Sequence, residues 1–81
     1  MTTTTAKRPL HEIAREIKQT WKKPYFGAIP YLHAMSSLTN VEDSFGYDSG
    51  RSVVNYFLAN ASTFRGDDAK RIKNELKNLL K

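Results

Sequence analysis

Cations dominate the chemistry that this sequence can offer. Thirteen Lys and Arg residues outnumber eight Asp and Glu residues, which gives a net charge of +5. Eight of the cations lie on or beside two predicted helices and are candidate phosphate contacts: Arg8, Arg15, Lys18, Lys22, Arg65, Lys70, Lys73 and Lys77. Cations that neutralise phosphates release counterions, so such flanks favour a nucleic-acid partner. The open alternative is an ordinary solvated lysine face.

The charge is unevenly distributed along the chain. Residues 7–23 hold six basic and two acidic residues, and residues 65–81 hold six basic and three acidic residues. Residues 24–64 hold one basic and three acidic residues. Two basic ends around a mildly acidic middle favour polyanions as partners.

The stretch YDSGRSVVNYF, residues 47–57, is the most motif-like part of the chain. Its polar segment 48–52 precedes a predicted helix, and backbone N–H groups at a helix start attract phosphate. The Asp48 carboxylate argues against a phosphate site, because it would accept those N–H groups as an N-cap and repel the anion. The stretch therefore predicts a cap and a turn in front of a core helix.

Catalytic and metal chemistry find little support. His11 and His33 have no paired acid or second histidine at ligand spacing, and the acids at 42, 43 and 48 lack the alternation of a calcium loop. The motifs of nucleotide-binding loops, zinc proteases and serine hydrolases do not occur. We expect a protein that is not an enzyme, with no catalytic residue, no metal and no cofactor.

Hydrophobic periodicity predicts four helices. They fall within residues 9–23, from about 28–30 to 38, within 51–61 and within 67–81, and residues 39–50 form a loop anchored by Val41 and Phe45. The third helix is apolar over more than half of its circumference, which is typical of a buried helix. The expected fold is all-α: a compact single domain of about four helices over residues 8–81, with a central apolar third helix. Residues 1–7 are expected to form a disordered arm.

Aromatic residues next to cations add a second candidate surface. Trp21, Tyr25 and Phe26 adjoin two lysines, and aromatics beside basic residues can stack on bases. The favoured use of Trp21 and Phe26 is nevertheless in the core. A helix-turn-helix formed by the last two helices is also open, with STFRGD as its turn. Candidate protein-interaction anchors are Tyr25, Phe26, Phe45, Tyr47 and Arg51.

Two stretches, KPYFGAIPYLHAM and YDSGRSVVNYFLANASTFRGDDAKRIKNEL, resemble small uncharacterised proteins of bacteriophages and mobile elements of Gram-positive bacteria. The resemblance covers roughly residues 21–80 and transfers no catalytic residue. It implies an origin in a phage or prophage and action inside a bacterial host cell. A regulator, a DNA-associated accessory protein, or an inhibitor of a host or defence protein would fit it.

These observations favour a small basic binding protein that acts on nucleic acid or on a nucleic-acid-processing machine. The alternative is a protein-interaction module that inhibits a host or defence protein, with a homodimer left open. The first ten residues lack the apolar segment of a secretory signal, and no apolar run approaches the roughly 18 residues of a membrane span. The absence of cysteine fits a reducing compartment, so we expect the host cytoplasm and no membrane contact.

Overall fold

The computed structural model describes residues 8–81, so the arm predicted for residues 1–7 lies outside the described residues. The described chain folds into one domain of four α-helices, one short 3-10 helix and one two-stranded sheet. In chain order the elements are α1 (Leu10–Thr20), η1 (Phe26–Ala28), α2 (Ile29–Met35), β1 (Ser44–Phe45), β2 (Asp48–Ser49), α3 (Gly50–Ala59) and α4 (Asp67–Leu79).

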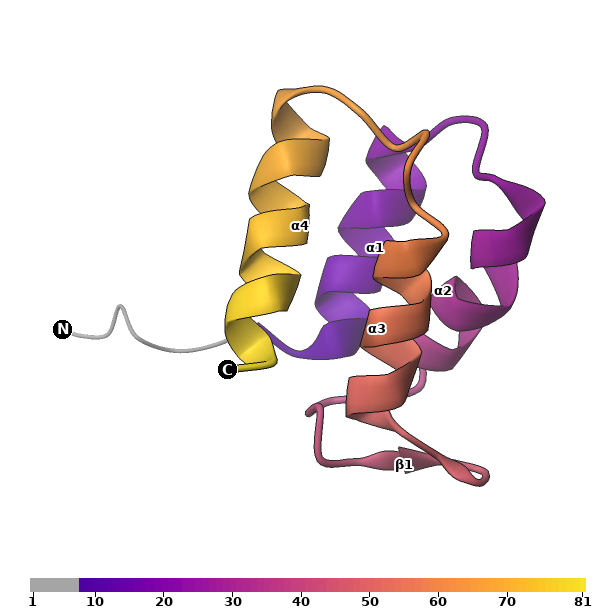
Figure 1. Ribbon diagram of the computed structural model, residues 1–81, viewed down its shortest axis with the longest axis vertical. Coiled ribbons are helices and arrows are strands. Elements are labelled where there is room, and N and C mark those ends of the chain that lie inside the picture. Colours follow the sequence, from indigo (N-terminus) through magenta and orange to yellow (C-terminus); the bar gives the residue numbers. More distant parts are fainter. Residues whose placement is uncertain (1–7) are drawn as a thin grey trace, which may run out of the picture.

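The helices alternate in direction, which fixes the two ends of the domain. Figure 1 shows α1 and α3 running one way and α4 running back. The connections from α1 to η1 and from α3 to α4 meet at the upper end of that view. The hairpin of β1 and β2, the start of α1 and the end of α4 lie at the lower end. We call these the connection end and the hairpin end.

Local sequence accounts for the helix boundaries. Pro9, predicted as the first helical residue, is instead the N-cap of α1: its φ of −61° is fixed by the ring, but its ψ of 149° is extended, and the helix begins at Leu10. Pro30 sits in the first turn of α2, where its missing N–H costs nothing. Gly66 precedes α4 at a φ of 110°, which favours glycine, and Asp67 and Asp68 occupy the positive end of that helix.

One apolar core joins all four helices. Helix α1 supplies four fully buried side chains, and Trp21 beyond its end is 6% exposed. Trp21 stacks on Phe64 with ring centroids 5.0 Å apart and meets the edge of Phe57 at 6.2 Å. The predicted core role of Trp21 is therefore confirmed, and the indole fastens the end of α1 to the connection between α3 and α4.

The fold corrects the all-α prediction at residues 39–50. Within this segment β1 pairs antiparallel with β2, in the register Ser44↔Ser49 and Phe45↔Asp48, around Gly46 at a φ of 63°. The helix cap is also one residue later than predicted: Ser49 Oγ, rather than the Asp48 carboxylate, accepts the Ser52 N–H at 3.1 Å. Val41 is buried as expected, but Phe45 is 43% exposed and anchors nothing.

Helix α3 presents one buried face and one exposed face. Val53, Val54 and Phe57 point into the core, whereas Asn55 and Tyr56 are exposed. The prediction of a central apolar third helix is therefore not confirmed. The helix-turn-helix alternative also fails, because residues 60–66 separate α3 from α4 and the motif needs a turn of about three to four residues.

Candidate nucleic-acid interface

The contact between α1 and α4 is an ion-pair network, which we call the seam. Arg8 Nη2 lies 2.9 Å from Glu16 Oε1 and 2.6 Å from Glu75 Oε1. Arg71 donates to the same Glu16 carboxylate and also reaches Asp68 at 3.4 Å. Hydrogen bonds from Arg71 and Arg8 lower the pKa of Glu16 against the opposing effect of burial. The seam thus uses two of the chain's arginines for structure.

The seam corrects the predicted grouping of Arg8 with the other cations of the first helix. Arg8 precedes α1, and its guanidinium turns to Glu16 and Glu75, whose hydrogen bonds raise its pKa. Arg15 and Lys18 lie on the opposite side of α1, where Lys18 Nζ donates to Ser36 Oγ after α2 at 2.8 Å. Lys22 lies beyond the end of the helix at Thr20. The two cations on α1 therefore face away from α4.

The cations of α4 form a second, separate flank on the side of the helix away from the seam. We call Arg65, Lys70, Lys73 and Lys77 the α4 flank. Lys70, Lys73 and Lys77 recur at spacings of three and four residues, so they share one side of the helix over about 10 Å. Among the residues that the structure describes, none of these four cations forms an ion pair. The two basic flanks of the sequence therefore do not merge across the seam.

Lys73 is the best-defined member of the α4 flank. Its Nζ lies 5.8 Å from the centre of the Phe64 ring, within the range of a cation–π contact. Burial lowers the pKa of Lys73, and the charges of Lys77 and Arg65 lower it further. No acid is among the causes of this shift.

An open hollow of about 270 Å³ adjoins these cations. Arg65, Lys70 and Lys73 line it together with apolar atoms of Phe64, Gly66 and Ala69. Phe64 is almost fully buried, so its ring forms the floor of the hollow. A surface with an apolar floor and a cationic rim can hold a phosphate–sugar backbone by charge and contact together.

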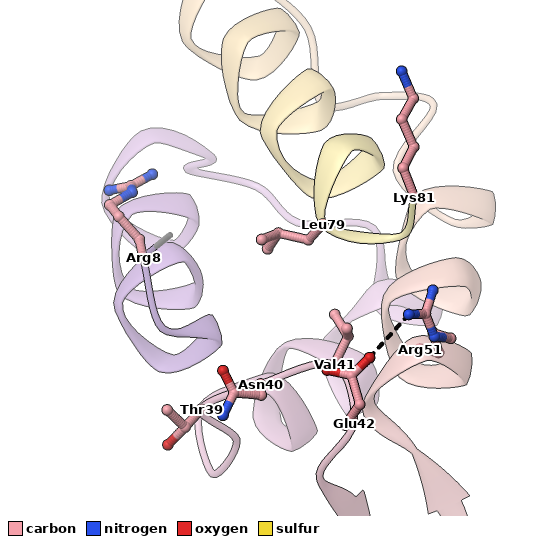
Figure 2. A pocket seen from close by; sticks show the side chains of 8 residues that line it. All are labelled: Arg8, Thr39, Asn40, Val41, Glu42, Arg51, Leu79 and Lys81. Carbon is pink, nitrogen blue, oxygen red and sulfur yellow. Dashed lines mark hydrogen bonds and ion pairs between the residues drawn. The ribbon is translucent and has the colours of Figure 1, made fainter. Parts of the chain in front are cut away.

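The second hollow, at the hairpin end, is architectural. It measures about 250 Å³ and is lined by Arg8, Thr39, Asn40, Val41, Glu42, Arg51, Leu79 and Lys81. Figure 2 shows the charged ends of Arg8 and Lys81 turned away from its centre and Arg51 joined to Glu42. Arg51 also donates to the Leu80 carbonyl oxygen at 2.6 Å, so this predicted interaction residue ties α3 to the end of α4.

The predicted aromatic anchors fall into two groups at opposite ends of the domain. Tyr25 and Phe26 lie at the connection end with ring centroids 4.8 Å apart, whereas Phe45 and Tyr47 lie on the hairpin. Phe26 is 76% exposed and Tyr25 is 44% exposed, so the expected core role of Phe26 is wrong. The sequence pattern also missed the exposed Tyr56, because helical periodicity placed it on an apolar helix.

Metal and membrane chemistry gain no support from the described part of the chain. Residues 8–81 contain no group of three or more His, Asp or Glu side chains placed to hold a metal ion. Over the same residues, every helix is too short or too polar to cross a membrane. His11 and His33 are both exposed on their helices.

Comparisons with known protein families, with curated proteins and with solved structures found no match to this chain.

Proposed function

We propose that this protein is a small non-enzymatic binder of nucleic acid that grips the phosphate backbone with the α4 flank. One observation supports the proposal most: Arg65, Lys70 and Lys73 surround one hollow beside Phe64, and within residues 8–81 none of them forms an ion pair with an acid. Burial, and then the charges of Lys77 and Arg65, lower the pKa of Lys73. A polyanion placed along this flank would offset the repulsion between these like charges. Nucleic acid, or a machine that carries it, supplies such a polyanion.

The expected mode of binding follows from the chemistry of the flank. Lysines and arginines on phosphates give affinity without reading base sequence, and the counterions they release make the affinity depend on salt. Four phosphate contacts predict a logarithmic salt slope of about −3.6, so the affinity should fall about a hundredfold between about 50 and 200 mM salt.

A charge-reversal pair tests the proposal. Lys70→Glu with Lys73→Glu should abolish binding to a labelled DNA duplex at low salt, because it replaces two attractive charges by two repulsive ones. The matched control is Arg15→Glu with Lys18→Glu, which makes the same change in net charge on the far flank of α1. Fluorescence anisotropy across a salt series gives the affinities.

Two results contradict the proposal. The first is a failure of the wild-type protein to bind duplex at low salt, since phosphate contacts do not depend on sequence. The second is an equal loss of affinity in the two charge-reversal pairs, because that would mean that total charge, rather than the α4 flank, governs the affinity.

The exposed rings of Tyr25 and Phe26 favour a second candidate, a protein-interaction module. Aromatic residues dominate the energetics of interfaces, and Phe26 is largely exposed. Such a module would inhibit a host or defence protein, alone or as a homodimer. A pull-down from bacterial lysate with and without nuclease separates the candidates, because only a protein partner stays bound after the nuclease. An origin in a phage or mobile element, which the resemblance implies, stays a prediction.

A further inference from the structure

We propose that the connection end binds single-stranded nucleic acid, with unpaired bases stacked on Tyr25 and Phe26 and the backbone continuing along the α4 flank. This inference rests on the proposed function and names its substrate class. The stacking surface consists of Tyr25 and Phe26, and the lysines just before it are Lys22 and Lys23.

The fold brings the stacking surface and the α4 flank to the same end of the domain. Trp21, which follows α1, stacks on Phe64, and Lys73 lies over the same Phe64 ring. The end of α1 therefore lies beside the start of the α4 flank. A Cβ atom on Gly27 would lie 2.9 Å from Asn60 Oδ1, which places η1 against the end of α3. Figure 1 shows both connections at this end.

The two rings are exposed in a way that suits stacking. Their planes are tilted by 52°, and Phe26 keeps most of its surface accessible. Base–aromatic stacking contributes about tenfold or more in affinity per base and tolerates any base, because every base has a π-face. Trp21, the other aromatic of this segment, is buried and cannot take part.

Charge complementarity points to an anionic occupant. Residues 17–41 contain no Asp or Glu, whereas Lys18, Lys22 and Lys23 fall within the same segment. Lys22 and Lys23 are exposed immediately before the aromatic pair. The acids of the loop and hairpin, at positions 42, 43 and 48, lie at the hairpin end. The nearest acids on the other side, Asp67 and Asp68, open α4, and Asp68 already pairs with Arg71.

The geometry also selects single strands over duplex. In a duplex the bases stack on one another inside the helix, so Tyr25 and Phe26 have no base face to meet. A single strand offers both its phosphates and its unstacked bases. Duplex binding should therefore use the α4 flank alone, and single-strand binding should use the α4 flank and the aromatic pair together.

The test compares a single strand of about 20 nucleotides with a duplex of the same sequence at low salt. Wild-type protein should bind the single strand about tenfold more tightly than the duplex. Tyr25→Ser with Phe26→Ser should remove this preference by weakening single-strand binding about tenfold and leaving duplex binding unchanged. The matched control is Phe45→Ser with Tyr47→Ser, which removes two exposed aromatics at the hairpin end and should change neither affinity.

Each result decides the question. If the Tyr25 and Phe26 variant keeps its single-strand affinity, the inference is overturned, and the proposed function stands as long as Lys70→Glu with Lys73→Glu abolishes duplex binding. If wild-type protein binds neither probe, both ideas fail together. Circular dichroism checks the fold, and Phe26→Ala alone provides a milder variant that should still lose about threefold or more in single-strand affinity.

Discussion

Lys73 connects the α4 flank to the core beneath it. The ammonium group lies over Phe64, whose ring stacks on Trp21, and it feels the charges of Lys77 and Arg65. Burial and the neighbouring charges act in the same direction and lower the pKa of Lys73. Removing one of the neighbouring charges should separate these two causes.

We expect Lys77→Gln to raise the pKa of Lys73, because the charge of Lys77 is one of its named causes. The measurement is an NMR titration of the Lys73 side chain. Lys81→Gln is the control, since Lys81 follows on the same side of the helix but does not contribute to the shift. An unchanged pKa in Lys77→Gln would mean that burial and Arg65 account for the whole shift, and the like-charge argument would lose its main support.

Sequence spacing predicted the cations of α4 well and Arg8 poorly. Lys70, Lys73 and Lys77 belong to a strongly periodic helix, so their shared side follows from helix geometry alone. Arg8 stands outside α1, and its partner Glu75 is 67 residues away, so no local pattern could reveal the pairing. The exposed position of Phe26 depends on η1, which has only three residues and is too short to show a periodic sequence pattern.

At the scale of elements, Gly50 joins the hairpin segment to α3. Its N–H donates to the Asp43 carbonyl oxygen at 2.6 Å, and the next N–H donates to the Val41 carbonyl oxygen at 2.9 Å. A Cβ atom on Gly50 would lie 2.8 Å from the carbonyl oxygens of Asn40 and Val41. The role of Gly50 is therefore close approach of two backbones, rather than the tight turn expected before the helix.

Gly50→Ala should destabilise the protein by about 1–3 kcal/mol, because backbone atoms cannot yield as a flexible side chain would. Chemical denaturation monitored by circular dichroism measures the free energy of unfolding. Gly46→Asn is the control: Gly46 has open space around it and a φ of 63°, which Asn tolerates. Equal stability of Gly50→Ala and wild type would show that residues 40–41 move aside at no cost.

The four helices were predictable because each carries an apolar stripe, whereas the hairpin was not. Each strand has only two residues, which is too few for an alternating pattern to appear. The hairpin is recognisable only from Gly46, and the pair Gly46–Tyr47 is a weaker signal than Asn-Gly or Asp-Gly. The sequence pointed to Asp48 as the cap of α3, but Ser49 takes that role, although both residues pair with β1.

At the scale of the whole molecule, the seam fastens the two ends of the described chain to each other. Arg8 reaches Glu75 across 67 residues, and Arg71 reaches Glu16 across 55 residues. These ion pairs neutralise the acids on the sides of α1 and α4 that face each other. Within the described chain, the cations on the outer sides of the two helices stay without an acidic partner. The positive surface that the proposed function needs is therefore a consequence of where the seam places its acids.

Glu16 should control how the stability of the domain depends on pH. Its pKa is lowered in the folded state, first by hydrogen bonds from Arg71. The stability that the Glu16 carboxylate contributes is therefore fully present above its unfolded-state pKa of about 4.3, and it is lost as the pH falls through the folded-state pKa. Glu16→Gln removes the carboxylate and should lower the melting temperature by a few degrees at neutral pH, since partly exposed pairs contribute modestly.

The gap in melting temperature between wild type and Glu16→Gln should close as the solution becomes acidic, because wild-type Glu16 then loses its charge as well. Thermal melts over a range of pH follow this convergence. Glu12→Gln is the control, because Glu12 is exposed on the same helix and forms no ion pair within residues 8–81. A gap that persists unchanged in acid would show that Glu16 acts through packing, and the seam would then not be an electrostatic link between α1 and α4.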